Sequence, residues 1–260
     1  MLKTTQLTFR YEDGSRGIDS ISFEAEKGKI IGIIGENGAG KSTFFKCLLG
    51  LLKPQSGQLI VDGQPISYDK KTLKQLRRTI NLVMQDPERQ IFYSSVVEDI
   101  ALGPKNLGFS QTEIDQITSQ CIQSVKAESF ANKPVQYLSF GQKKRVAIAG
   151  VLALSCKILL LDEPETGLDP MMRRDIMTLL QSLADEGKKI IVSSHNMDMI
   201  YEICDYVYVM HQGKIINEGP VDDVMSDEVL LKQAHLECPM VIKLAKKLNL
   251  KIADIRNHLY

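Results

Sequence analysis

The sequence has no excess of charge of either sign and no long hydrophobic run. Its 32 basic and 32 acidic side chains cancel, which argues against a protein that coats nucleic acid or binds membranes through a polybasic surface. No apolar run approaches the roughly 20 residues of a membrane-spanning helix, because Ser155 and Lys157 interrupt the longest candidate, 151–161. We therefore expect a chain that is soluble by itself, in which any membrane role comes through a partner.

Cysteine is scarce as well. The five cysteines are odd in number and none forms a C-x-x-C pair, so we expect reduced, mostly buried thiols of a cytoplasmic protein. Residues 1–10 alternate polar and apolar side chains, so we expect no signal peptide there. A chain of 260 residues can form one large domain, or one core with a subdomain.

The stretch 35–42, GENGAGKS, fits the phosphate-binding pattern G-x-x-x-x-G-K-[ST]. The apolar run 30–34 predicts a buried strand before it, and an apolar-periodic stretch that stops at Pro54 predicts a helix after it. Glycines let the backbone wrap a phosphate, and amides at a helix N-terminus supply partial positive charge. Lys41 is predicted to reach the β- and γ-phosphates, and Ser42 to hold Mg²⁺. A glycine-rich turn that matches by chance is the alternative.

Short apolar stretches alternate with helical patterns along the chain. Stretches at 30–34, 80–84, 158–161 and 189–193 predict buried strands of a largely parallel sheet that is covered on both faces. Two alternating stretches within 7–25 predict an antiparallel edge sheet before that core. The predicted fold class is α/β: a P-loop NTPase core with a mainly parallel sheet, an antiparallel β edge subdomain and an inserted helical subdomain.

Helical patterns fill the middle and the end of the chain. Residues 110–113, SQTE, match a capping box, and we place the inserted helical subdomain at about 86–154. The predicted domains are a nucleotide-binding domain over 1–220 and a C-terminal helical extension over 221–260. The expected apolar face of that extension consists of Met240, Val241, Leu244, Ala245 and Leu248.

Two carboxylates follow the predicted strand 158–161. Because successive side chains at a strand end point in different directions, Asp162 can complete a Mg²⁺ shell while Glu163 faces an attacking water. That division of labour suits hydrolysis of a γ-phosphate. Without the phosphate loop, an acidic turn at a strand end would be the simpler interpretation.

Further motifs occur in a fixed order around these residues. The order along the chain is Gln85, then Leu138-Ser139-Phe140-Gly141-Gln142, then the strand end Asp162-Glu163-Pro164, then Gly167-Leu168-Asp169, and last His195. Together with Tyr11 and the phosphate loop, this set resembles the ATPases of the ABC type over about 2–219, most of the chain. The resemblance makes 138–142 the signature sequence and 167–169 the D-loop.

The resemblance implies ATP and Mg²⁺ as cofactors and a role for each matching residue. Tyr11 would stack on adenine, Glu163 would act as general base, and His195 would contact the γ-phosphate. The signature residues would begin a helix aimed at the γ-phosphate of a second subunit, so that two chains sandwich two ATP molecules. The implied cofactor-binding residues are Tyr11, Gly35, Asn37, Gly38, Gly40, Lys41, Ser42, Thr43, Ser139, Gly141 and Gln142; the catalytic ones are Glu163, His195 and Gln85; the metal ligands are Ser42, Gln85 and Asp162.

Several positions keep simpler interpretations or depart from the family pattern. Tyr11 and His195 could be packing and structural residues, and 143–145, KKR, is interpreted as the solvated face of the signature helix. Phe140 replaces the first glycine of the signature and would be strained at a positive φ. Glu165, where a threonine is usual, adds a third carboxylate near Glu163. Three histidines receive no function: His211, His235 and His258.

More specific segments resemble the ATPases of energy-coupling-factor importers, especially the cobalt-import (CbiO-type) family. They are 85–92, 97–100, 103–108 and 143–154. The resemblance implies an ATP-hydrolysing subunit on the cytoplasmic face of the cell membrane that energises import of a metal ion, with cobalt as first choice, or of a vitamin. The implied partners are a second ATPase subunit, a transmembrane coupling protein and a substrate-binding membrane subunit, with no nucleic acid.

Two alternative functions stay open, and so does the surface on which a membrane partner would dock. One is a soluble ABC ATPase that acts on ribosomes or DNA, although such proteins usually carry two cassettes or long coiled coils. The other is a non-hydrolysing regulator, against which Lys41 and Glu163 argue. For a membrane partner, we expect the apolar side chains of 91–93 within the segment 85–100 to form the docking surface; the alternative is that Ile91 and Phe92 fill the core of the helical subdomain.

Overall fold

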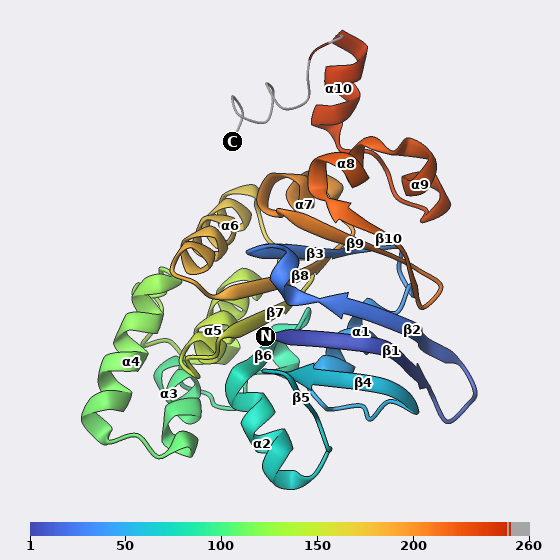
Figure 1. Ribbon diagram of the computed structural model, residues 1–260. Helices are drawn as coiled ribbons and strands as arrows, with labels where there is room; N and C mark the ends of the chain where they lie inside the picture. Colours follow the sequence, from blue (N-terminus) through green and yellow to red (C-terminus); the bar gives the residue numbers. More distant parts are fainter. Residues whose placement is uncertain (249, 251–260) are drawn as a thin grey trace. The chain divides into compact units, whose positions relative to one another are not determined.

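The computed structural model describes residues 1–248 and 250 (Figure 1). Its elements belong to two units, Met1–Leu76 with Lys189–Tyr260, and Arg77–Lys188. Asn249 and the residues 251–260 of the predicted extension, His258 among them, lie outside the described part of the chain. Within the described part, none of the helices combines the length and the apolar character that crossing a membrane requires. All five cysteines lie in the described part of the chain, where they are buried and form no disulfide, as predicted.

The N-terminal strands of the first unit form an antiparallel sheet in the order β2-β1-β4-β5. Leu7 of β1 and Ile21 of β2 face each other across the ladder and are fully buried, which explains the alternating pattern of both stretches. The strands are β1 (Leu2–Arg10), β2 (Arg16–Glu24), β4 (Ser56–Val61) and β5 (Gln64–Pro65), and the short 3-10 helix η1 (Ala25–Lys27) follows β2.

A second set of strands in this unit surrounds β3 (Ile30–Ile34). This strand pairs in parallel with β8 (Lys189–Ser194) on one side and with β9 (Tyr206–His211) on the other (Figure 1). All five residues of β3 are buried, as expected of a strand that is covered on both faces. β10 (Lys214–Pro220) adds an antiparallel hairpin to β9, with positive φ angles at the turn residues Gln212 and Gly213.

The helices of the first unit follow its strands closely. The described ones are α1 (Lys41–Leu48), α2 (Lys70–Thr79, within which the unit boundary falls), α7 (Met197–Ile203), α8 (Val221–Ser226), α9 (Glu228–Gln233) and α10 (Met240–Leu248). The predicted apolar face of α10 is buried only in part, at Ala245. Ile242 and Ala245 are buried, whereas Met240, Leu244 and Leu248 are exposed. The helix therefore packs through the stripe that contains Ile242 and Ala245, while the neighbouring stripe of Met240, Leu244 and Leu248 faces outward.

The second unit combines two parallel strands with helices. β6 (Ile80–Val83) pairs with β7 (Ile158–Asp162), and α3 (Val96–Leu107), α4 (Gln111–Ser124) and α5 (Phe140–Leu152) pack on one another. α6 (Pro170–Asp185) follows β7, and the 3-10 helices are η2 (Pro87–Arg89) and η3 (Val135–Tyr137). The capping box predicted at 110–113 is present at the start of α4. The α/β fold class is confirmed, while the subdomain boundaries at about 86–154 and the domain limits stay predictions.

Candidate active site

The phosphate loop connects β3 to α1, as the sequence pattern predicts. Gly40 has a φ of 102°, and a Cβ added to it would lie 2.5 Å from the Gly17 carbonyl oxygen. A Cβ on Gly35 would lie 2.3 Å from the Met210 carbonyl oxygen. Only glycine fits either position, because one requires left-handed backbone and both require close approach of two main chains. The loop is therefore a main-chain cradle that side chains do not fill.

Lys41 and the start of α1 give this cradle its charge. The Lys41 ammonium donates hydrogen bonds to the carbonyl oxygens of Gly35, at 2.6 Å, and Glu36, at 3.0 Å. The N-cap of α1 is Gly40, which has no side chain to cap the first turn, so no N-cap side chain competes with an anion for the N–H groups of that turn. Ser42 is exposed at the same helix start, where a hydroxyl can reach a metal ion.

Tyr11 and His195 belong to the same unit as the loop. The Tyr11 hydroxyl lies 2.7 Å from Thr43 Oγ1, and its ring meets Phe9 edge-on, yet the side chain keeps 38% of its surface exposed. It thus contacts Phe9 and Thr43 and keeps part of its surface accessible. His195 follows β8 and lines a pocket of about 460 Å³ together with Glu36 and Asn37. The structure therefore brings His195 to the phosphate loop, which simple spacing along the chain would not show.

The carboxylate end of β7 carries the second group of candidate residues, in the second unit. Asp162 ends the strand, and both it and Glu163 are buried. Gln85 donates a hydrogen bond from Nε2 to Glu163 Oε2 at 2.9 Å, and Thr166 Oγ1 donates to the same oxygen at 3.3 Å. Glu163 has a φ of 46°, a conformation that costs a residue with a side chain on the order of 1–3 kcal/mol. Such strain is typical of functional positions.

The order of these features matches a known family. The sequence model described as "ABC transporter" matches residues 18–166, more than half of the chain. The chain belongs to the ABC transporter family. ABC ATP-binding proteins are ATPases coupled to transport, so the protein is an enzyme of that class and the predicted family is confirmed.

Several relatives align with this ABC ATPase over nearly its whole length. The energy-coupling factor transporter ATP-binding protein EcfA of Methanocaldococcus jannaschii is 44% identical over 96% of this chain and 90% of the relative. The cobalt import ATP-binding protein CbiO of Salmonella paratyphi A is 40% identical over 100% of this chain and 96% of the relative. The solved structure of cbiO1 from Clostridium perfringens, described as part of the ABC transporter complex cbiONQ, has a TM-score of 0.80 at 38% identity, covering 94% of this chain and 98% of that one.

The predicted signature sequence of this ABC ATPase forms the start of α5. Ser139 is the N-cap: its Oγ accepts a hydrogen bond from Gln142 N at 3.3 Å, and its own N–H donates to Gln142 Oε1 at 3.0 Å. This capping box is the second in the unit, and sequence reasoning missed it. A Cβ on Gly141 would lie 2.5 Å from Met172 Sδ, so any larger residue there would displace the end of the Met172 side chain.

Phe140 fits the signature without strain, since it begins α5 and is not among the residues with positive φ. Its ring lies over Gly167 of the D-loop, where an added Cβ would be 2.5 Å from the ring. The ring thus covers a backbone position that only glycine can occupy at its φ of 76°. The departure from the commonest signature is therefore a packing contact between signature and D-loop.

Lys144 is the residue that sequence reasoning misjudged most. The interpretation of 143–145 as a solvated face is wrong, because Lys144 is fully buried. Its ammonium donates to the carbonyl oxygens of Met84, Gln85 and Glu163, at 3.1, 2.6 and 3.4 Å. Burial lowers the pKa of Lys144 to about 8, although nearby carboxylates, Glu165 first among them, raise it. Lys144 thus ties the backbone of Gln85 to that of Glu163.

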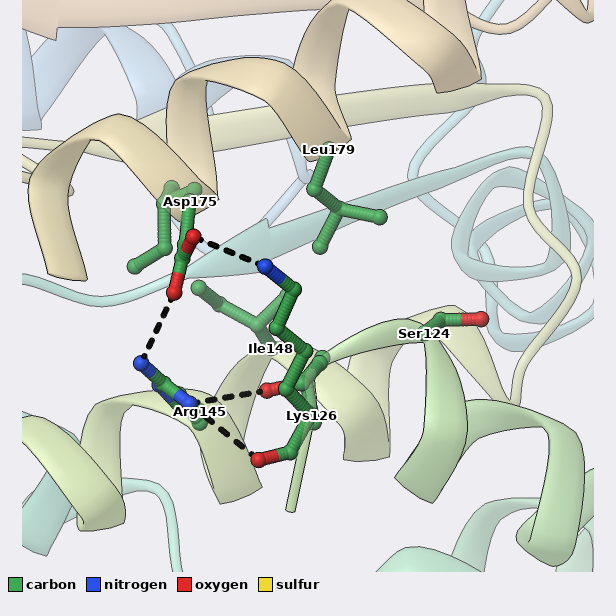
Figure 2. A pocket seen from close by; sticks show the side chains of 8 residues that line it. Ser124, Lys126, Arg145, Ile148, Asp175 and Leu179 are labelled. Carbon is green, nitrogen blue, oxygen red and sulfur yellow. Dashed lines mark hydrogen bonds and ion pairs between the residues drawn. The ribbon is translucent and has the colours of Figure 1, made fainter. Parts of the chain in front are cut away.

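Arg145 is also engaged rather than solvated. Figure 2 shows Asp175 of α6 between Arg145 and Lys126, with Arg145 Nη2 at 3.3 Å and Lys126 Nζ at 2.9 Å from its carboxylate oxygens. Arg145 Nη1 also donates to the carbonyl oxygen of Lys126 at 3.1 Å. This network joins α5, α6 and the end of α4. The sequence does not show which face of α5 is buried, and without that information neither Lys144 nor Arg145 can be recognised as an internal contact.

Proposed function

We propose that this ABC ATPase is the nucleotide-hydrolysing subunit of an energy-coupling-factor importer, peripheral to the cytoplasmic face of the cell membrane. Its cargo is a metal ion, with cobalt as the first choice, or a vitamin. The alignment with EcfA and CbiO supports this proposal, because it includes the helices α8 and α9 beyond the nucleotide-binding elements. The observation that best supports ATP hydrolysis by this chain is the hydrogen bond from Gln85 to Glu163 at the end of β7.

The residues of the chain divide the reaction between them. The phosphate loop and Lys41 bind the phosphates, and the exposed ring face of Tyr11 stacks on adenine. Glu163 takes a proton from the attacking water while Gln85 holds its carboxylate, and His195 contacts the γ-phosphate from the pocket beside the loop.

The oxygen donors Ser42, Gln85 and Asp162 suit Mg²⁺, a hard cation that prefers hydroxyl, amide and carboxylate oxygens. The buried carboxylate of Asp162 would contribute the charge of that site. When bound, Mg²⁺ neutralises negative charge on the phosphate oxygens.

The signature helix acts on a second subunit, either a copy of this chain or a close paralogue. Ser139, Gly141 and Gln142 begin a helix of 13 residues, whose N-terminus favours an anion such as the partner's γ-phosphate. In the capping box the Ser139 oxygen acts as an acceptor, so its hydroxyl hydrogen stays available for donation to a phosphate oxygen. Two chains would then enclose two ATP molecules.

The membrane partner docks on the segment 85–100. The alternative that Phe92 fills a core is wrong, because 77% of its surface is exposed, and Tyr93 is 43% exposed. The backbone N–H groups of Phe92 and Tyr93 donate to Asp99 Oδ1 at 2.7 and 3.0 Å, which fixes the loop that presents both rings. Two ordered, exposed aromatic rings suit a contact with an apolar partner surface.

The test is co-expression of this chain with a transmembrane coupling protein and a substrate-binding membrane subunit, followed by measurement of assembly and uptake. Wild type should co-purify with them and support uptake of labelled cobalt or vitamin. Tyr93→Ala and Phe92→Ser should retain ATP binding but lose assembly. Tyr137→Ala is the matched control, since Tyr137 is an equally exposed aromatic of the same unit, at 74%. Normal assembly of both loop variants would move the docking site elsewhere, and failure of wild type to assemble would contradict the importer proposal.

A further inference from the structure

Three side chains from distant parts of the first unit converge beside the phosphate loop. They are Glu36 of the loop, His211 at the end of β9 and His235 after α9, and one ligand atom of each lies within 4.8 Å of the others. Glu36 Oε2 is 2.5 Å from His235 Nδ1, and Glu36 Oε1 is 3.0 Å from His211 Nδ1. The two imidazole rings stand edge to face with 5.4 Å between their centroids. We call these residues the Glu36–His211–His235 cluster.

The environment of His211 leaves one buried ring nitrogen facing a carboxylate. His211 Nδ1 is buried and makes no hydrogen bond of good geometry within the described part of the chain, although a carboxylate oxygen lies 3.0 Å away. A bare ring nitrogen would point its lone pair at a negative oxygen. Either a proton or a metal ion must therefore lie between the two atoms.

The ligand set and its spacing suit a metal ion. Two imidazole nitrogens and one carboxylate oxygen are a common protein ligand set for Zn²⁺ and similar ions, with water in the fourth position. Ligand atoms at roughly 2.0–2.2 Å from a tetrahedral ion lie about 3.4 Å from one another. The separations of 2.5 and 3.0 Å, with all three within 4.8 Å, require only small side-chain rotations to reach that geometry.

The cluster is accessible and its carboxylate is charged. Glu36 and His235 line the pocket of about 460 Å³ that also contains His195, and the His235 side chain is 65% exposed. A hydrated ion can therefore enter from the pocket and lose its water stepwise. The hydrogen bond with His235, before any other cause, holds the pKa of Glu36 below its ordinary value, so the carboxylate is ionised at neutral pH.

We propose that Glu36, His211 and His235 form a binding site for a divalent transition-metal ion of the Zn²⁺, Co²⁺ or Ni²⁺ type. Bound there, the ion would link the phosphate loop, through Glu36, to the end of β9 and to the segment after α9. Glu36 also supplies one of the loop carbonyls that accept a hydrogen bond from Lys41, so the ion would hold the residue that positions this lysine. The site lies on this chain and is separate from any cargo site of a transporter. The assignment of this site follows from the geometry of the cluster and does not depend on the proposed transport function.

The test is a titration of the full chain, freed of metal by chelation, with Co²⁺ in the absence of ATP and Mg²⁺ at neutral pH. Tetrahedral coordination should give intense visible absorption bands that saturate at one equivalent, and Zn²⁺ should abolish them by displacement. His235→Ala is the deciding variant, because its exposed side chain can be removed without disturbing the fold. We expect it to weaken binding at least about tenfold, and we expect the same of His211→Ala.

His195→Gln is the matched control, since it removes a histidine of the same pocket that does not belong to the cluster. It should leave Co²⁺ affinity unchanged. Absence of saturable binding to the wild-type chain would overturn the proposal. So would unaltered binding in a folded His235→Ala chain, or an equal loss in His195→Gln.

Discussion

The phosphate loop of the first unit and the acidic end of β7 in the second are built by different means. In the loop, glycines bring main chains together, and the one side chain that contributes charge, Lys41, lies in the same eight-residue motif. At the end of β7, the geometry of Glu163 depends on Gln85 and Lys144, which come from two other elements. The residues of the first arrangement lie in one short motif, whereas those of the second come from separate parts of the folded unit.

This difference predicts which substitutions affect binding and which affect chemistry. A main-chain cradle binds phosphates largely through backbone amides, and it contains no group that takes part in the chemical step, so changes there alter affinity. A side-chain network around one carboxylate holds it in a strained conformation, so changes there alter the chemical step. Four substitutions test this contrast, in order of decreasing expected effect.

Glu163→Gln removes the proposed general base and should give the largest effect. The amide can still accept the hydrogen bond from Gln85, so the local structure should persist. Turnover should fall by about 10²–10⁴ while ATP affinity stays near that of wild type. Glu165→Gln, which neutralises a neighbouring carboxyl, is the control and should keep turnover within a few fold. Near-normal hydrolysis by Glu163→Gln would remove this residue from the role.

Lys41→Ala should weaken ATP binding rather than chemistry, because it removes the cation at the phosphate loop. A charge-assisted hydrogen bond contributes roughly 1.5–3 kcal/mol, so the dissociation constant for ATP should rise about 10- to 100-fold. Equilibrium binding of a fluorescent ATP analogue measures the change.

The same variant also tests the two-chain site. At an ATP concentration too low to fill the weakened site of Lys41→Ala, a mixture of Lys41→Ala and Ser139→Arg chains should show more ATPase activity than either variant alone, because mixed dimers combine both lesions in one composite site and leave the other intact. A mixture as inactive as its components would contradict independent composite sites.

Lys144→Met keeps the length of the buried side chain but removes the ammonium that joins three carbonyl oxygens. Turnover should fall about tenfold, equivalent to ~1.4 kcal/mol in the barrier, with ATP affinity unchanged. Lys143→Met is the matched control on the same helix: Lys143 pairs with the exposed Glu88, a contact that contributes little. Equal effects of the two variants would show that Lys144 has no special part.

The pH dependence of unfolding gives a second readout for Lys144. Its pKa is about 8 in the folded chain, below the ordinary 10.5, so between these values the unfolded state binds a proton that the folded state has lost. The unfolding free energy of wild type should therefore rise relative to Lys144→Met as pH increases from about 8 to 10.5, by at most ~1.4 kcal/mol per pH unit. A difference that is flat or falls over this range would contradict a buried, depressed lysine.

Phe140→Gly restores the commonest signature and should have the smallest effect on catalysis. Glycine at a helix start costs about 1 kcal/mol, and the ring contact with Gly167 is lost, so Tm should fall by roughly 2–4 °C. Turnover should stay within about threefold, since the capping box of Ser139 and Gln142 remains. A large loss of turnover would show that the ring transmits D-loop position to the signature.

The sequence predicted the strand–loop–helix context of 35–42 and the Ser110 cap, because local spacing and capping chemistry determine them. It did not predict the burial of Lys144, since a lysine within KKR has the same pattern on either face of a helix. It gave no role to His211 or His235 either. Only the pairing of β9 with β3 brings His211 to Glu36, and no spacing along the chain records that.

The central position of β3 has a consequence for the order in which the protein is made. Ile30 pairs with Ile190, so β3 leaves the ribosome about 160 residues before its neighbour β8, and β9 follows later still. At about 5–20 residues per second, the phosphate loop spends on the order of 10 s without the strands that support it. Closing so long a segment also slows folding. The first nucleotide-binding motif to be translated is therefore held in its final form only by the last third of the chain.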